Sequence, residues 1–277
     1  MNRSIQTILN AQPAMDGAGV KINRLSLLRQ GLSDPFLMLD ELRSDDPQDF
    51  IAGFPPHPHR GMETLTYIRI GGLAHRDSMG NTGKITSGGV QWMSAGSGVI
   101  HSEMPLREHD RLHGFQLWIN LPAKDKMKAP DYRDVNQNEI PLIKIPGGEI
   151  YLAAGDWLIN GEKISGPLNK LAANVHYADL QLNAGADFTQ EIPADHQVVV
   201  FVYEGEIEAD KPVKKGQMAL FNQQGQLSIK ARQNSAMLIL HGRALREPIA
   251  SYGPFVMNTP EEIETAIAEY QQGTLVR

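Results

Sequence analysis

Two pairs of metal-binding residue types stand at the ends of one stretch of the sequence, with a single residue between the members of each pair. The stretch opens with His57 and His59 and closes with His101 and Glu103. Successive side chains of a β-strand point to opposite faces, so residues i and i+2 share a face. Two such strands side by side would aim three imidazoles and one carboxylate in the same direction.

The spacing alone leaves a second interpretation open, in which these are ordinary surface or core histidines. The chain has nine histidines, and an i, i+2 pair arises by chance in about a third of such chains. Pro58 lacks the N–H that a β-ladder uses, which favours an edge strand or a strand entry. The second pair, and the glycine-rich turns on both sides, favour a metal site.

The segments around these pairs have the pattern of an all-β protein. From residue 62 to residue 119, short apolar runs alternate with turns of Gly, Asn and Asp, and no helix-length periodicity lies between them. Such spacing is typical of a β-sandwich or barrel. A polar segment at 121–141 is interpreted as a linker, after which the same rhythm resumes, as in a diverged internal duplication. The expected strands are 21–28, 36–41, 65–70, 73–77, 90–93, 98–103 and 115–120, then 143–145, 149–153, 176–182, 198–203 and 236–241.

The last segment has a different pattern, which predicts an amphipathic helix at 260–272. Thr259 is a capping residue, Pro260 takes the first helical position, and Glu262 stands three residues after the cap. Gly273 ends the helix. Its polar face is acidic, which is unlike a membrane-binding helix.

Composition excludes several classes of function. The chain has 277 residues, no cysteine and a net charge of −6, so thiolate metal sites and cysteine nucleophiles are excluded and direct nucleic-acid binding is disfavoured. No apolar run approaches the roughly 18–20 residues of a membrane span, and the N-terminus lacks the pattern of a secretory signal. We expect a cytoplasmic monomer that binds neither nucleic acid nor membrane.

Several sequence blocks resemble those of the pirin family, a two-barrel branch of the cupins. They span about residues 16 to 273 and read DPFLMLDEL, PHPHRGMETLTY, AHRDSMGNTG, GGVQWMSAGSGVIHSEMP, HGFQLWINLP and GPFVMNTPEEIE. The resemblance implies two jelly-roll β-barrels packed face to face, with a short C-terminal helix. We place an N-terminal metal-binding barrel at 1–130 and a C-terminal barrel without metal at 131–277, which includes the helix.

The resemblance also implies the ligand set of the metal. Pirins commonly hold iron with three histidines and one glutamate, which fall here on His57, His59, His101 and Glu103. In most cupins the carboxylate comes from the first motif, which here would be Glu63. That residue is therefore expected beside the ligands, where an outer hydrogen-bonding shell is usual. A similar position is expected for His113. Fe(II) is the expected ion, although this ligand set also suits Mn, Co, Ni, Cu and Zn.

The implied activity is that of a quercetin 2,3-dioxygenase, an oxidoreductase acting on a flavonol and O2. Metal coordination lowers the pKa of a bound hydroxyl, and Glu103 is the candidate catalytic residue that accepts its proton. The alternative is a non-catalytic regulator that binds a transcription factor or a metabolic enzyme in a metal- and redox-dependent way. A metal-dependent isomerase or another dioxygenase is a third option, since one fold hosts many chemistries.

The second half of the chain is expected to carry no metal. Matching Gly205 to the turn at 71–72 places Gln190 or Glu191 where His57 would be, and Ile192 or Pro193 where His59 would be. His196 and His241 then stand alone in the sequence.

Overall fold

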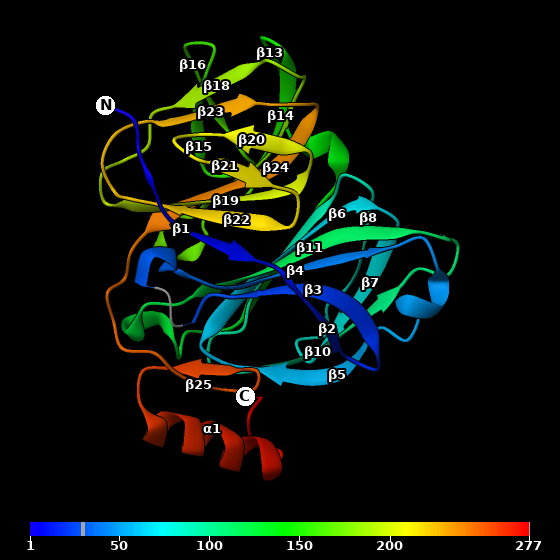
Figure 1. Cartoon of the computed structure of the whole chain (residues 1–277). Helices are drawn as coiled ribbons and strands as arrows, with labels where there is room; N and C mark the ends of the chain where they lie inside the picture. Colours follow the sequence, from blue (N-terminus) through cyan, green and yellow to red (C-terminus); the bar gives the residue numbers. More distant parts are fainter. Residues whose placement is uncertain (29–30, 277) are drawn as a thin grey trace. The chain divides into compact units, whose positions relative to one another are not determined.

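The computed structural model of the chain describes residues 1–28 and 31–276. The described residues are mostly in β-strands, with a single α-helix near the C-terminus, as the sequence predicts (Figure 1). By their contacts the residues group into two compact units. Among the described residues, the first unit comprises 13–28, 36–137 and 245–276, and the second comprises 1–12, 31–35 and 138–244.

Two large sheets form most of the first unit. The larger has seven strands in the order β12-β9-β6-β11-β4-β3-β2, and the smaller has four in the order β5-β10-β7-β8. The strands of the larger sheet are β2 (Gln12–Asp16), β3 (Val20–Ser26), β4 (Phe36–Ser44), β6 (Met62–Ile70), β9 (Val90–Ser94), β11 (Leu112–Asn120) and β12 (Asp131–Val135). Those of the smaller sheet are β5 (Phe54–His59), β7 (Gly72–Asp77), β8 (Thr82–Thr86) and β10 (Val99–Pro105).

The second unit repeats this plan of one seven-stranded and one four-stranded sheet, with orders β1-β22-β19-β24-β17-β14-β13 and β18-β23-β20-β21. The larger sheet consists of β1 (Ile5–Asn10), β13 (Leu142–Ile145), β14 (Gly148–Ala154), β17 (His176–Leu182), β19 (His196–Glu204), β22 (Gln217–Phe221) and β24 (Ser235–Arg243). The smaller consists of β18 (Asp187–Gln190), β20 (Glu206–Glu208), β21 (Pro212–Lys214) and β23 (Leu227–Ala231). A hairpin is formed by β15 (Asp156–Ile159) and β16 (Glu162–Ser165).

Short 3-10 helices occupy some of the connections. They are η1 (Gly31–Ser33), η2 (Pro47–Asp49), η3 (Ala123–Asp125), η4 (Gln137–Glu139) and η5 (Ala172–Asn174).

Glycines end a corresponding strand in each unit. The nine-residue strands β6 and β19 are followed by Gly71 and Gly205, with φ of +94° and +77°. A Cβ at Gly71 would lie 2.5 Å from the carbonyl oxygen of Arg111, and one at Gly205 would lie 2.4 Å from that of Asn234. Both turns therefore require glycine. The shared position agrees with the internal duplication expected from the sequence.

Each end of the chain belongs to the unit that a division at residue 130 would not assign to it. Strand β1 pairs with β22 of the second unit, whereas the C-terminal segment belongs to the first unit. That segment contains the hairpin of β25 (Ala250–Tyr252) and β26 (Phe255–Met257), followed by α1 (Pro260–Gln271). The domain division into 1–130 and 131–277 stays a prediction.

The interpretation of 121–141 as a linker is wrong for part of that segment. Strand β12 pairs with β9 at the edge of the larger sheet of the first unit. The side chains of Tyr132 and Asp134 both accept hydrogen bonds from Gln91 Nε2, at 3.0 Å. An edge strand with one solvated face has few apolar residues, so its sequence resembles that of a loop.

The predicted C-terminal helix is confirmed as α1, which lies beside β25 in Figure 1. Thr259 and Glu262 form the reciprocal capping box that the sequence indicates. Ile263 and Ala266 are buried against Phe255 and Met257. No helix in the described part of the chain is long and apolar enough to cross a membrane.

Candidate metal centre

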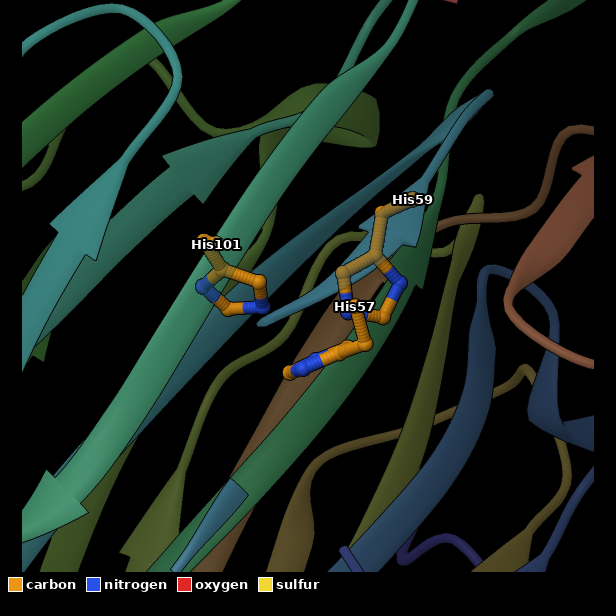
Figure 2. A group of neighbouring side chains, drawn as sticks. All are labelled: His57, His59 and His101. Atoms are coloured by element: carbon orange, nitrogen blue, oxygen red, sulfur yellow. The ribbon is translucent and has the colours of Figure 1, made fainter. Parts of the chain in front are cut away.

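Two neighbouring strands of the smaller sheet of the first unit bring three histidines together. His57 and His59 lie on β5 and His101 lies on β10. The strands are antiparallel, with His101 paired directly to His57. Because His57 and His59 are two residues apart, their side chains share a face of β5. Figure 2 shows the three imidazoles gathered in one place, as the spacing in the sequence predicts.

The three rings are close enough to bind one ion. One potential ligand atom from each lies within 4.8 Å of the others. The ring centroids of His57 and His101 are 4.4 Å apart, and those of His59 and His101 are 5.0 Å apart. His59 and His101 are each only 2% exposed. Burial, with a smaller contribution from His57, lowers the pKa of His59 to about 3, and burial also lowers the pKa of His101 well below its usual value. Both imidazoles are therefore neutral at pH 7, as metal ligands must be.

Backbone carbonyls fix the tautomers of His57 and His59. Nδ1 of His57 lies 2.9 Å from the carbonyl oxygen of Pro55, and Nδ1 of His59 lies 3.3 Å from that of Pro254. A carbonyl can only accept, so each Nδ1 carries the proton and donates it. The Nε2 lone pair of each ring is then available to a metal, and this outer hydrogen bond is the usual one for ligating histidines.

A short chain of side chains orients His101 in the same way. Nε2 of His75 lies 3.0 Å from Oδ2 of Asp77, so His75 donates from Nε2 and its Nδ1 is an acceptor. That Nδ1 lies 3.5 Å from Nδ1 of His101, a long contact that favours the proton on Nδ1 of His101. Nε2 of His101 is buried and has no hydrogen-bond partner among the described residues. A buried nitrogen without a partner, close to two further imidazoles, fits a bound metal ion.

Glu103 lies on the inward face of β10, two residues after His101, and is 2% exposed. Its carboxylate accepts hydrogen bonds from Nε2 of Gln116 at 2.7 Å and from Oγ1 of Thr66 at 3.2 Å. It is not among the ligand atoms that lie within 4.8 Å of one another. The structure thus brings Glu103 to the same strand and face as His101, and its role as the fourth ligand stays a prediction.

The two residues expected beside the ligands lie on the larger sheet. Glu63 of β6 is fully buried, and its carboxylate accepts from Nε1 of Trp92 at 3.1 Å and from Nζ of Lys128 at 2.9 Å. His113 of β11 pairs through Nε2 with Oε1 of Glu41 at 3.0 Å. A role for Glu63 and His113 beside the metal stays a prediction. The residues that hold the imidazoles in place include Pro254, His75 and Asp77, which lie inside the pirin-like blocks but are not among the residues expected at the site.

The expectation that His196 and His241 stand alone is wrong. The structure places them with His176 in a second group of three histidines whose potential ligand atoms lie within 4.8 Å of one another. These residues come from three adjacent strands of the second unit and are far apart in the sequence. The signal for this group is the register of the strands, which a single sequence does not display.

Two family models match the chain. The model described as Pirin matches residues 21–119, and the model described as Pirin C-terminal cupin domain matches residues 177–276. A Vibrio cholerae protein provisionally named as a quercetin 2,3-dioxygenase is 44% identical over 274 residues, covering 98% of this chain and 97% of its own length. Human pirin is 35% identical over 266 residues, covering 92% of this chain and 88% of its own.

Solved structures agree with these matches. The crystal structure of quercetin 2,3-dioxygenase from Acinetobacter baumannii superposes with a TM-score of 0.90 and 30% identity, covering 99% of each chain. A bacterial pirin from Escherichia coli, in complex with nickel(II), has a TM-score of 0.62 and 21% identity, covering 86% of this chain and all (100%) of its own. The latter supports the fold alone. The predicted all-β fold with two cupin barrels and a C-terminal helix is confirmed.

Proposed function

This chain belongs to the pirin family, and from that premise we propose that it is a metal-dependent dioxygenase that oxidises a flavonol-type substrate with O2. The observation that carries the proposal is the convergence of three imidazoles, of which the buried Nε2 of His101 has no hydrogen-bond partner among the described residues. The names of the Vibrio cholerae and Acinetobacter baumannii relatives support quercetin 2,3-dioxygenase as the reaction.

The residues that would hold the ion are His57, His59 and His101, with Glu103 as the proposed fourth ligand. A bound divalent transition metal would supply Lewis acidity toward the oxygens of an enediol-type substrate and lower the pKa of the substrate hydroxyl. Three imidazoles suit Fe(II), Mn(II), Co(II), Ni(II), Cu(II) and Zn(II). We propose Fe(II) as the resident ion, and metal analysis of the purified protein tests that choice.

Glu103 is the proposed acceptor of the substrate proton. Its carboxylate is buried on the same face as His101, and Gln116 and Thr66 already donate to it. These two hydrogen bonds hold the carboxylate in place. Acceptance of a proton from the substrate hydroxyl requires an ionised carboxylate within hydrogen-bond reach. Replacement by glutamine keeps the size and removes the basic oxygen pair.

Oxygen uptake with quercetin tests the function. Wild-type protein should consume oxygen in proportion to its bound metal, and His101→Ala should lose at least about a hundredfold in turnover because a ligand is missing. Glu103→Gln should retain metal yet lose turnover. His109→Ala is the control, since His109 belongs to neither group of three histidines. Full turnover in His101→Ala at wild-type metal content would refute the proposed site.

The alternative function is metal-dependent binding of a protein partner without catalysis. The match to human pirin extends over nearly the whole chain. The length of the match therefore does not decide between the catalytic and the non-catalytic function. This alternative predicts a complex with a transcription factor or a metabolic enzyme whose stability changes with the oxidation state of the metal. Affinity purification with Fe(II)- and Fe(III)-loaded protein tests it, and identical partner sets in the two states would count against it.

A further inference from the structure

Three adjacent strands of the larger sheet of the second unit present histidines on the same face. His176 opens β17, His196 opens β19, and His241 lies near the end of β24, which runs between them. His176 is paired directly with His241, and His241 is paired with Val198, two residues from His196. The period of two along each strand therefore places all three side chains on one face.

That face points into the unit. Along β19 the residues that share parity with His196 include Val198 and Val200, and along β24 Ile239 shares parity with His241. All three apolar residues belong to the core of the second unit. The exposed fractions of His176, His196 and His241 are 6%, 1% and 2%. Three imidazoles thus stand at one end of an otherwise apolar interior.

The rings are close together and held firmly. The rings of His176 and His241 stack with centroids 4.1 Å apart and planes 19° apart. The indole of Trp157 contacts His241 and His176 edge-on, with centroids 5.0 and 5.9 Å away. The backbone of Gly155 lies against the ring of His176, where a Cβ would approach to 2.3 Å. Such packing restricts the rotamers of the three rings before any ligand binds.

The nitrogen atoms of the three rings lie close enough together to share one ion. Nδ1 of His176 lies 2.9 Å from the carbonyl oxygen of Asn174 and donates to it, and the backbone of Asp156 offers the same ring a second hydrogen bond that a metal ion would replace. Nδ1 of His196 lies 2.9 Å from Nδ1 of His241. Two nitrogens each about 2.1 Å from one tetrahedral ion are separated by about 3.4 Å, so the two rings would move apart by about 0.5 Å to hold it. Without an ion, only one nitrogen of that pair can donate to the other.

We propose that His176, His196 and His241 form a second metal site, which takes a first-row transition ion that prefers nitrogen ligands, such as zinc(II). This assignment goes beyond the proposed function and does not depend on it. The first site uses β5 and β10 of a four-stranded sheet, whereas this group uses β17, β24 and β19 of a seven-stranded sheet. The second site is therefore not a copy of the first at the equivalent strands.

The donor atoms of the group decide which ions fit. Its potential ligand atoms are three imidazole nitrogens, with no carboxylate oxygen among them. The guanidinium of Arg3 donates to the backbone carbonyls of Ile192 and His196, so a positive charge lies beside the group. Nitrogen donors beside a cation do not suit Mg²⁺ or Ca²⁺, which need oxygen ligands. Zinc, copper and nickel bind imidazole strongly enough to be retained.

The test leaves the second group intact and removes the first. The double variant His57→Ala/His59→Ala is dialysed against micromolar zinc and examined by native mass spectrometry. It should hold about one zinc ion per chain, against about two in the wild type. X-ray absorption at the zinc edge of the double variant should show three imidazole nitrogens at about 2.0–2.1 Å. A double variant that binds no zinc overturns the proposal.

A second substitution locates the ion. Adding His241→Phe to the double variant keeps an aromatic ring beside Trp157 and removes a ligand, so the zinc should be lost. Adding His109→Ala instead is the matched control and should retain it. Zinc that survives His241→Phe lies elsewhere and contradicts the assignment. If the His241→Phe protein does not fold, the zinc content and absorption spectrum of the double variant decide the matter alone.

Discussion

Neutralising Glu269 is expected to loosen the strand that carries His59. The Arg60 side chain is 1% exposed and forms an ion pair with Glu269 of α1, whose side chain is 22% exposed. Arg60 follows His59 directly, and its carbonyl accepts a hydrogen bond from the backbone N–H of Val256 at 3.1 Å. The C-terminal segment therefore holds the end of β5 at two points.

The expected magnitude follows from the burial of the pair. Removing one partner of a buried ion pair costs about 3–5 kcal/mol. Water can reach Glu269, glutamine still accepts a hydrogen bond, and Nε of Arg60 keeps its bond of 2.6 Å to the carbonyl of Ser97. We therefore expect Glu269→Gln to lower the free energy of local opening by about 2–3 kcal/mol. This corresponds to amide exchange that is about 30- to 150-fold faster.

The same change should weaken metal binding at the first site. Nδ1 of His59 donates to the carbonyl of Pro254, which lies in the loosened segment. Loss of such an outer partner lowers metal affinity by about 10- to 100-fold. Hydrogen exchange of peptides covering 54–60 and 254–271, with zinc competition on the same sample, measures both effects.

The control variant is Glu264→Gln, which makes the same chemical change at an exposed position of α1. It should leave exchange and zinc affinity unchanged. Exchange in Glu269→Gln that stays within about threefold of this control would refute the reasoning.

Three further predictions concern the frame around the site. The buried ammonium of Lys126 donates to Asn120 and to two backbone carbonyls, and burial lowers its pKa from 10.5 to about 8. The folded state therefore binds fewer protons than the unfolded state between pH 8 and 10.5, so the free energy of unfolding should rise over that window by up to about 3 kcal/mol. Urea unfolding of the wild type and of Lys126→Met at pH 7 and pH 10 measures this rise. An equal change in stability in the two proteins would contradict it. Gly61→Ala should lower the free energy of unfolding by about 2 kcal/mol or more, because Gly61 has φ +76° and a Cβ would lie 2.0 Å from the carbonyl oxygen of Val256. An unchanged melting temperature would contradict this prediction. Thr259→Ala should cost about 1 kcal/mol through loss of the cap of α1, visible as faster exchange in the first turn of the helix and absent if the cap contributes nothing.

The sequence predicts the first group of histidines because strand geometry links spacing to direction. His57 and His59 are two residues apart, so any strand that contains them aims both rings to one side. The pairing of His101 with His57 then needs only that β5 and β10 be neighbours. The capping pattern at Thr259 predicts α1 for the same reason, since all of its signals are local.

Features that depend on register between distant strands are beyond such reasoning. His176, His196 and His241 meet because β24 pairs with β17 on one side and with β19 on the other. A shift of one residue in either pairing would turn a ring to the other face. The same holds for Pro254, which reaches His59 from 195 residues away in the sequence. Strand β12 was not predicted because its composition is polar, and its position at the edge of the sheet accounts for that composition.

Oxygen consumption by one preparation of the protein, before and after removal of its metal, is the decisive measurement of the proposed dioxygenase activity. The metal is removed with a chelator, and Fe(II) is restored in steps while quercetin-dependent oxygen uptake and bound iron are measured together. We expect no uptake without metal, and uptake that rises in proportion to the iron bound at His57, His59 and His101. Absence of quercetin-dependent uptake at full loading with Fe(II), and likewise with Mn(II), Co(II), Ni(II), Cu(II) and Zn(II), would contradict it.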